Sequence, residues 1–328
     1  MSTGSKARGL KGAPVSTPEV RESGKVVKVA KAFKATVKDS RGKKGRRSGH
    51  PEWPVVAGKD LARLKFSEIS PKFRLADIDP AEKPFCSGDK ERDKARVDEL
   101  AVELDVLQNV FFADRRFKLL VVLQGMDTSG KDGTLRGVFS RMTPLGVRTV
   151  AWKAPNDEEK SHDVLWRIHQ QVPRGGEIVV FNRSHYEDVL VPVVAGSLSP
   201  TQLSDRYREL NDFERMLTES GTVVLKFMLH ISRDEQRARL QDRLDDPTKR
   251  WKFALGDLTV RKQWDAYQRA YEGMIAQTST PWAPWNIVPA DSKTHRNLMI
   301  ATLMRDAMVG LDLRFPPLAH ELEGVRVE

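Results

Sequence analysis

The sequence predicts an α/β protein whose mostly parallel sheet is covered by helices on both faces. Short apolar segments that are typical of strands buried on both faces recur along the chain. Segments with helical periodicity lie between them, and Gly or Pro residues separate the two kinds of segment. With 328 residues, the chain is long enough for one large domain or two modest ones.

The expected elements begin with a long amphipathic helix over residues 90–115. In it Val97, Leu100 and Leu104 share an apolar face with charged residues opposite. The elements predicted after it are, in order, a strand at 119–123, a helix at about 131–142, a strand at 147–151, a helix from Asn156 to Pro173, a strand at 177–181, a helix at 203–219, a strand at 222–230, a helix opened by Ser232, a helix at 257–276, a strand at 286–289 and a helix at 293–310.

The first strand leads into a segment with the spacing of a phosphate-binding P-loop, Gly125-x4-Gly130-Lys131. Glycines let the backbone N–H groups point inward, and the helix N-terminus adds partial positive charge. We expect Lys131 to contact the transferred phosphate. The alternative is an ordinary strand–turn–helix connection. The other residues expected to bind phosphate or nucleotide here are Gly125, Met126, Thr128, Ser129, Gly130, Asp132, Gly133 and Thr134.

A second polar cluster, residues 182–188, follows the strand at 177–181. In P-loop enzymes a carboxylate at this place holds or orients Mg²⁺, but here the residue is Asn182. Asn coordinates through its carbonyl oxygen and brings no charge, so we expect Asp127 in the loop to supply the carboxylate. Arg183 is placed to clamp a phosphate. The alternative is a helix N-terminus with polar caps.

A third cluster is the basic segment at about 232–256. Arg239 and Arg243 share a helix face, and Lys249-Arg250-Trp251-Lys252 follows. Taken alone, this pattern fits a solvated helix, but near a P-loop it suggests a mobile lid over phosphates. A separate aromatic segment, residues 282–285, is interpreted as core or as a loop beside a nucleobase.

The net charge of +10 is concentrated at the N-terminus. Residues 1–50 hold 14 Lys and Arg against three acids, a net charge of +11, and the remainder holds 41 against 42. This head is predicted to be disordered or, over residues 25–38, to form a basic amphipathic helix. Residues 51–90 are predicted to be an extended lead that packs on the domain, and 316–328 a tail.

The cysteine count and the hydropathy of the chain limit the kinds of cross-link, metal site and cellular location to be expected. Cys86 is the only cysteine, so neither an intrachain disulfide nor a cysteine-cluster metal site is expected. No apolar run is as long as a membrane span, and no secretory signal is visible, which favours the cytoplasm. The histidines show no metal-ligand spacing.

Taken together, these motifs resemble the polyphosphate kinase type 2 family. The resemblance runs collinearly over about residues 70–315 and leaves out the basic head. The segments that carry it are Gly125-Met-Asp-Thr-Ser-Gly-Lys-Asp-Gly-Thr134, Pro144-Leu-Gly-Val147, Gly176-Glu-Ile-Val-Val-Phe-Asn-Arg-Ser-His-Tyr-Glu-Asp-Val189, Asn211-Asp-Phe-Glu214, Arg243-Leu-Asp-Asp-Pro-Thr-Lys-Arg-Trp-Lys-Phe253, Thr278-Ser-Thr-Pro-Trp-Ala-Pro-Trp285 and Pro289-Ala-Asp-Ser-Lys293.

The resemblance implies a thymidylate kinase-like, P-loop kinase fold over residues 91–315, with a helical lid at about 232–256. It implies Mg²⁺-dependent, reversible phosphoryl transfer between inorganic polyphosphate and AMP, ADP or GDP by a homo-oligomer, with a tetramer as one form. The implied catalytic residues are Asp127, Lys131 and Arg183, the metal ligands Asp127, Asn182 and Glu187, and the lid contacts Arg239, Arg243 and Lys252.

The acceptor subclass and two rival functions stay open. Asn182 followed by His185-Tyr-Glu-Asp188 is similar to the branch of the family that accepts both nucleoside mono- and diphosphates. One rival function is an ATP-dependent nucleoside monophosphate kinase. The other is a polyanion- or nucleic-acid-binding protein that acts through its basic head.

Overall fold

The computed structural model describes residues 73–327. The basic head, its expected helix at 25–38 and the lead up to residue 72 lie outside the described residues. The described part of the predicted lead, residues 73–89, contacts α10 (Trp264–Thr278). Its short 3₁₀ helix, η3 (Leu75–Asp77), starts with a backbone N–H that donates to Glu272 Oε1 at 2.9 Å. Residues 314–327 are exposed and hold only η5 (His320–Leu322).

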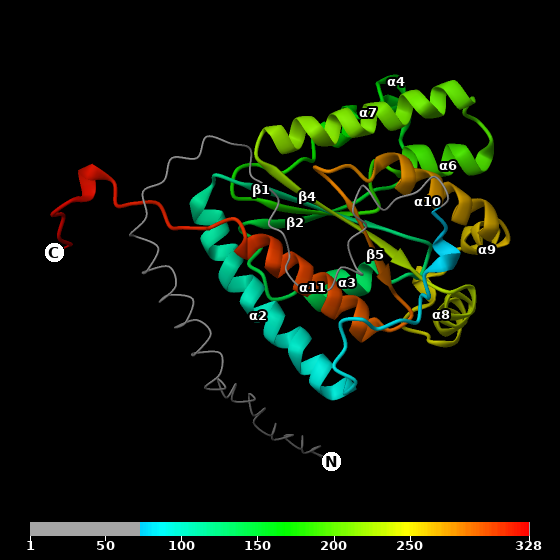
Figure 1. The fold of residues 1–328 in the computed structure, drawn as a ribbon, viewed down its shortest axis with the longest axis horizontal. Coiled ribbons are helices and arrows are strands. Elements are labelled where there is room, and N and C mark those ends of the chain that lie inside the picture. Colours follow the sequence, from blue (N-terminus) through cyan, green and yellow to red (C-terminus); the bar gives the residue numbers. More distant parts are fainter. Residues whose placement is uncertain (1–72, 328) are drawn as a thin grey trace, which may run out of the picture. The chain divides into compact units, whose positions relative to one another are not determined.

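The sheet has five parallel strands in the order β2-β3-β1-β4-β5 (Figure 1). The bounds of the strands are β1 Lys118–Gln124, β2 Val147–Ala151, β3 Ile178–Asn182, β4 Thr222–His230 and β5 Trp285–Pro289. β1 lies in the middle, where Val122 is in register with Phe181 of β3 and Lys226 of β4. The apolar runs are buried on both faces, which confirms the predicted α/β class.

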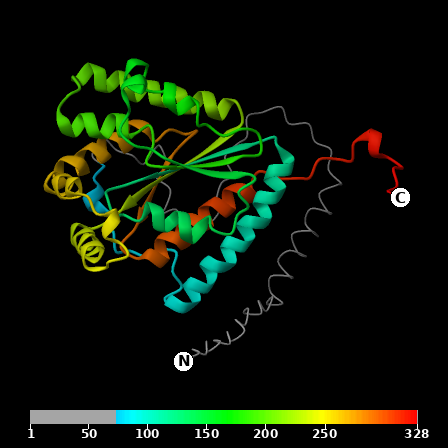
Figure 2. The same ribbon diagram turned by 180° about the vertical axis from the view of Figure 1, so that it is seen from behind.

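Helices cover both faces of the sheet (Figures 1 and 2). One layer contains α6 (Glu187–Ala195), α7 (Pro200–Glu219) and α10 (Trp264–Thr278). The other contains α2 (Lys90–Asp114), α3 (Lys131–Val138) and α11 (Lys293–Val309). Side chains of β1 alternate between the layers: Leu120 and Val122 join the core that includes Phe213 of α7 and Met274 of α10. Such burial of apolar surface is the main source of stability in a fold of this kind.

Two predicted helices are each divided in the structure. The helix expected from Asn156 to Pro173 is α4 (Asp157–Ser161) followed by α5 (Trp166–His169). The break arises because His162 is extended and the Asp163 side chain accepts the backbone N–H of Leu165. The helix expected at 257–276 is α9 (Leu255–Lys262) followed by α10, with Gln263 in a non-helical conformation between them.

The helix α6 was not predicted. It contains four valines and Pro192, residue types that disfavour helices when sequence is the only guide. The segment predicted to form the lid, residues 232–256, consists of α8 (Arg233–Asp245), the 3₁₀ turn η4 (Arg250–Lys252) and the start of α9. No helix within residues 73–327 combines the length and the hydropathy needed to cross a membrane.

Candidate active site

The predicted P-loop connects β1 to α3 at the carboxyl end of the sheet, beside the end of β3. Two glycines are required by its geometry. Gly125 has φ 150°, and a Cβ there would lie 2.7 Å from the carbonyl oxygen of Leu229. Gly130 has φ 112° and forms the N-cap of α3. Thr128 is a non-glycine residue with φ 64°, a conformation that concentrates at functional sites.

Lys131 is buried inside the loop that it follows. Its ammonium donates to the carbonyl oxygens of Gly125 at 2.7 Å and Met126 at 3.2 Å. Burial lowers the pKa of Lys131 to about 8, and the nearby charge of Arg183 acts in the same direction. Within residues 73–327 these neutral carbonyls are the only hydrogen-bond partners of Lys131, and such a buried cation is well suited to receive a phosphate.

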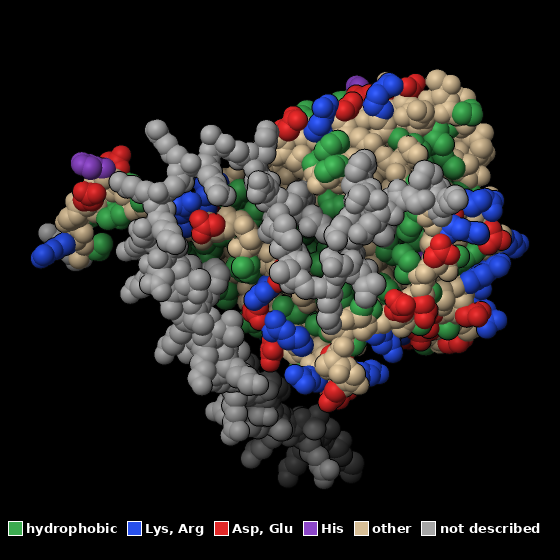
Figure 3. All heavy atoms as spheres, in the orientation of Figure 1, with side chains coloured by type: hydrophobic (Ala, Val, Ile, Leu, Met, Phe, Trp, Pro, Cys, Tyr) green, Lys and Arg blue, Asp and Glu red, His purple; other side chains and the backbone are tan. Residues whose placement is uncertain are grey.

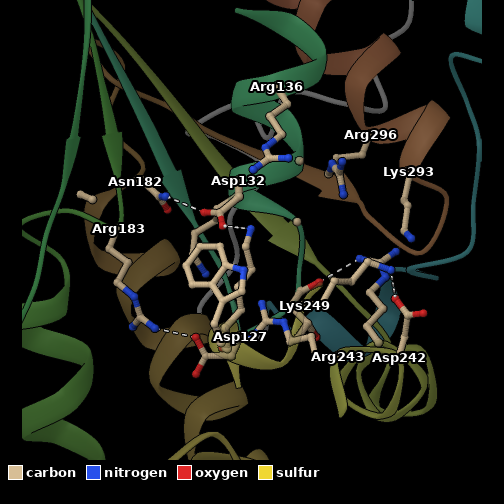
Figure 4. A pocket seen from close by; sticks show the side chains of 18 of the residues that line it. Asp127, Asp132, Arg136, Asn182, Arg183, Asp242, Arg243, Lys249, Lys293 and Arg296 are labelled. Atoms are coloured by element: carbon tan, nitrogen blue, oxygen red, sulfur yellow. Dashed lines mark hydrogen bonds and ion pairs between the residues drawn. The ribbon is translucent and has the colours of Figure 1, made fainter. Parts of the chain in front are cut away.

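Arg183 joins two of the predicted carboxylates into one network. It donates to Asp127 Oδ1 at 2.5 Å (Figure 4). It also donates to Glu187 Oε2 at 2.9 Å. Burial by itself would lower the pKa of Arg183, but the charges of Glu187 and Asp127 outweigh it and raise the pKa. The other carboxylate oxygen of Glu187 accepts from Gln124 Nε2. The network presets the orientation of the Arg183 guanidinium and leaves some of its N–H groups without a partner in the network.

Asp132 occupies the position after Lys131 and links three elements. Its Oδ1 accepts from Asn182 Nδ2 at 2.9 Å, and its Oδ2 accepts from Lys252 Nζ at 3.2 Å. Although burial opposes it, these bonds lower the pKa of Asp132. Asp132 therefore connects the P-loop helix to the end of β3 and, through Lys252, to the predicted lid segment.

The predicted metal ligands are only partly arranged for a metal. Among residues 73–327, no group of three or more His, Cys, Asp and Glu side chains could hold a metal ion. Glu187 accepts hydrogen bonds from Gln124 and Arg183 and does not line the cavity, so it orients Arg183 from behind the cavity wall. Asp127 and Asp132 line the cavity with Asn182. One or two carboxylates together with phosphate oxygens and water are the usual ligands of Mg²⁺, and these residues fit such a site.

Arg239 differs from the expected phosphate-binding lid residue. Its five N–H groups donate to Glu235 and to the backbone carbonyls of Thr128, Ser129, Ala290 and Asp291, at 2.7 to 3.2 Å. No donor is left for a phosphate, so Arg239 clamps the P-loop between α8 and the loop after β5. Arg243 donates to the Lys252 carbonyl and to Asp257, and it lines the cavity.

Arg296 of α11 is a site residue that the sequence patterns did not reveal. Its buried guanidinium lies against the first turn of α3, where a Cβ at Gly130 or Gly133 would come within 1.8 Å or 2.8 Å of its nitrogens. Burial lowers the pKa of Arg296 to about 10, and the charge of Arg239 contributes. The signal in the sequence was the spacing of Gly130, Gly133 and Gly137, a glycine face on which α11 packs closely.

These residues surround one cavity of about 710 Å³. Ten Lys and Arg residues line it against three Asp, so it suits a highly charged polyanion. Figure 4 shows Arg136 on α3 and Lys293 and Arg296 on α11 projecting toward it. The cationic residues of the lining are Lys131, Arg136, Lys153, Arg183, Arg239, Arg243, Lys249, Lys252, Lys293 and Arg296.

The tryptophans beside the cavity come from segments other than residues 282–285, which were interpreted as core or as a loop beside a nucleobase. Trp285 is fully buried, and its Nε1 donates to Thr278 at 2.9 Å, so it belongs to the core. Trp152, after β2, and Trp251, in η4, line the cavity instead. Trp251 is 76% exposed, and the ammonium of Lys252 lies 5.1 Å from the centre of its ring.

A buried polar network supports the segment that carries Arg183. Glu214 of α7 accepts from Tyr186 at 2.7 Å and from Lys226 at 2.6 Å, and it lies 3.2 Å from His185 Nε2. Burial would raise the pKa of Glu214, but the Lys226 ammonium and His185 hold it below its ordinary value. The network connects the residues directly after Arg183 to α7 and β4. It therefore holds the backbone next to Arg183 in place on the side opposite the cavity.

Comparisons with known proteins converge on one family. A sequence model of the family Polyphosphate kinase 2 (PPK2) matches residues 87–314. An AMP/ADP-polyphosphate phosphotransferase from Meiothermus ruber is 48% identical over 261 residues, which are 78% of this chain and 96% of that protein. An ADP-polyphosphate phosphotransferase from Rhodopseudomonas palustris is 38% identical over 225 residues, 65% of this chain and 78% of that protein. The crystal structure of polyphosphate kinase 2 from Arthrobacter aurescens TC1 superposes with a TM-score of 0.75 at 42% identity, covering 83% of this chain and 95% of that one.

Proposed function

Since this chain belongs to the polyphosphate kinase 2 family, we propose that it catalyses reversible, Mg²⁺-dependent phosphoryl transfer between inorganic polyphosphate and nucleotides. The observation that carries the proposal is the P-loop cavity with its excess of cationic residues. We propose that the acceptors are AMP and ADP, with GDP as a further one, because the relative at 48% identity is named an AMP/ADP-polyphosphate phosphotransferase. The Mg²⁺ requirement rests on the two cavity aspartates and on the charge of the substrates.

Phosphoryl transfer requires little covalent chemistry from the protein, so catalysis depends mainly on positioning and on charge neutralisation. The Lys131 ammonium would exchange its carbonyl partners for oxygens of the transferred phosphate. Arg183, held by Asp127 and Glu187, would donate its remaining N–H groups to the same phosphate. Both groups are already placed before the substrate binds, which reduces the reorganisation needed in the transition state.

The metal would be held by Asp127, with Asp132 and the Asn182 carbonyl beside it, and would neutralise charge on the phosphate oxygens. Asp127 thus has two tasks, because it also accepts from Arg183. Lys252 of the lid reaches Asp132, so the lid and the P-loop meet beside the reacting groups. Arg243 and Lys249 come from the same segment and line the cavity, which they would shield from water when a substrate is bound.

The test is to mix the purified protein with Mg²⁺, polyphosphate and either AMP or ADP, and to follow ATP formation and the reverse reaction. We expect turnover with polyphosphate as donor and none without it. Turnover with ATP as the only donor would favour a nucleoside monophosphate kinase instead. Absence of transfer in both directions would refute the proposal.

Two variants separate the enzyme from a polyanion-binding protein that acts through its head. For the enzyme, Lys131→Ala should abolish transfer, and deletion of residues 1–50 should leave it largely intact. A binding protein would show the reverse: salt-sensitive binding that is lost with the head and unaffected at Lys131. We also propose a homo-oligomer, which light scattering of the same preparation measures.

A further inference from the structure

The orientation of the Arg183 guanidinium depends on a residue that does not face the cavity. We propose that Gln124, the last residue of β1, is a positioning residue for phosphoryl transfer, because it holds both the backbone next to Arg183 and the carboxylate that orients the guanidinium. This role rests on the proposed function, in which Arg183 donates to the transferred phosphate. It adds that the strand before the P-loop sets the geometry of the arginine that follows β3.

Gln124 is buried and lies outside the lining of the active-site cavity. Its exposed fraction is 0%, whereas Arg183 lines the cavity of about 710 Å³. The preceding residue, Leu123, is in register with Asn182 of β3, and its carbonyl oxygen accepts the backbone N–H of Arg183 at 3.1 Å. The side chain of Gln124 therefore reaches the surroundings of Arg183 from inside the domain, where it does not meet a substrate.

The charged side chains that a substrate could meet directly lie elsewhere. Figure 3 shows Lys, Arg, Asp and Glu side chains gathered on the surface over α8 and α9. Arg243, Lys249 and Lys252 of that segment also line the cavity. Replacing one of them changes the charge that a substrate meets, whereas replacing the neutral Gln124 does not. An effect of Gln124 on transfer must therefore pass through the residues that it contacts.

The backbone of Arg183 needs support from its surroundings. Its φ is 66°, in the left-handed region that is unfavourable for a residue with a Cβ and persists only where the surrounding structure holds it. The next residue, Ser184, is fully buried, and its Oγ accepts the backbone N–H of Tyr186 at 3.2 Å. The same hydroxyl donates to Gln124 Oε1 at 3.1 Å. Gln124 thus holds the turn in which Arg183 lies.

The other end of the Gln124 amide acts on the Arg183 side chain through Glu187. Gln124 Nε2 donates to Glu187 Oε1, and Glu187 Oε2 accepts from Arg183 at 2.9 Å. The chemistry fixes the orientation of the amide, because a carboxylate only accepts and so requires the NH₂ group, which leaves the carbonyl oxygen for the Ser184 hydroxyl. Gln124 also forms a hydrogen bond with the buried Tyr271 of α10, which holds the amide in place.

The experiment compares Gln124→Met with the matched control Gln108→Met. Met has nearly the shape of Gln but no amide, so Gln124→Met releases Ser184 and Glu187 with little change in packing. Gln108 of α2 is also 0% exposed, and within the described residues its amide has no hydrogen-bond partner. For both variants the thermal unfolding midpoint, kcat, and KM for ADP and for polyphosphate are measured.

The expected result is a loss of kcat in Gln124→Met alone. Its kcat should fall by about ten- to hundredfold, as expected for a lost hydrogen bond to a charged group. KM for both substrates should stay at the wild-type value, because the cavity lining is unchanged. A second background, Arg183→Lys, keeps the charge but has no planar fork to hold between two carboxylates. In that background Gln124→Met should cause a much smaller loss, because the two residues act as a unit.

Four results would overturn the inference. An unchanged kcat in Gln124→Met would mean that Arg183 keeps its geometry without the amide. An equal loss in the control, or a loss that follows the folded fraction at the assay temperature, would mean that the residue serves folding only. A rise in one KM without a fall in kcat would indicate a direct contact with that substrate. The same loss factor in both Arg183 backgrounds would show that the effect does not pass through Arg183.

Failure of the proposed function would look different from all four results. The wild type itself would then transfer no phosphate between polyphosphate and a nucleotide.

Discussion

Lys131 should give the enzyme an alkaline limit to its activity. The ammonium is needed in its charged form, and its pKa in the folded protein is about 8. Above this pH the group loses its proton, so kcat/KM for polyphosphate should fall about tenfold for each further pH unit, because only the charged fraction is competent. At pH 9 about one tenth of the free enzyme would carry the charge.

The assay is the initial rate of ATP formation from polyphosphate and ADP between pH 7 and 9.5, at constant ionic strength. Phosphate monoesters lose their last proton near pH 6, so the nucleotide does not titrate in this range. The parameter kcat/KM reports the free enzyme, whereas kcat reports the complex. Because a bound phosphate favours the charged lysine, the alkaline limb of the pH profile, where the rate falls, should lie at higher pH for kcat than for kcat/KM.

The control is Lys131→Arg, whose guanidinium stays charged throughout this range. Its residual activity should show no limb near pH 8. Lys131→Ala should also lack the limb and should lie about 10²- to 10³-fold below the wild type at pH values under 8, as expected for the loss of a preorganised donor. A wild-type kcat/KM that stays level up to pH 9.5, or the same limb in Lys131→Arg, would refute the reasoning.

The same pKa has a consequence for stability. The folded-state pKa lies below the ordinary value of 10.5, so between about pH 8 and 10.5 the unfolded chain binds more protons. Below pH 8 the cost of burying the charged lysine is fully present, and it is relieved as the pH rises toward 10.5. Below pH 8 this cost lowers the free energy of unfolding by about 3 kcal/mol, at 1.36 kcal/mol per pKa unit.

Three further predictions concern other parts of the site. Asp127→Asn should lower kcat by about 10²-fold or more and raise the Mg²⁺ concentration at half-maximal rate, because it removes a charge that serves both metal and Arg183; unchanged Mg²⁺-dependent transfer would show that the loop has another role. Glu214→Gln should reduce the free energy of unfolding by about 3 to 5 kcal/mol in guanidinium titrations, since it leaves Lys226 buried without a carboxylate; equal stability would contradict the ion pair. Arg239→Met should reduce the free energy of unfolding by about 1 to 3 kcal/mol, because carbonyls of the P-loop lose their donors. It should also raise KM for polyphosphate and for nucleotide together, and a change in one KM alone would mean a direct contact with that substrate.

Local features of the sequence were sufficient for the strands and for the P-loop. The run from Leu119 to Leu123 is apolar at every position, and such a run is stable only when both faces of a strand are covered. Gly125 and Gly130 stand where the backbone has positive φ, so their positions in the sequence describe the loop directly. The residues of the 182–188 cluster follow a strand, and parallel strands end at one edge. These features depend on neighbours along the chain, which is why they could be predicted.

The tertiary structure decided which side chains do what at that edge. Arg239 was expected on a phosphate, but its donors are all used by the Glu235 carboxylate and by four backbone carbonyls of the P-loop and of the loop after β5. Glu187 was expected on a metal, but it lies outside the cavity lining and accepts from Gln124 and Arg183. Arg296 follows the P-loop by more than a hundred and fifty positions and reaches it only because glycines on α3 let α11 approach. Hydrogen-bond capacity is finite, and its use is settled by distant parts of the chain after packing, so residue type and spacing identify the site without assigning every role within it.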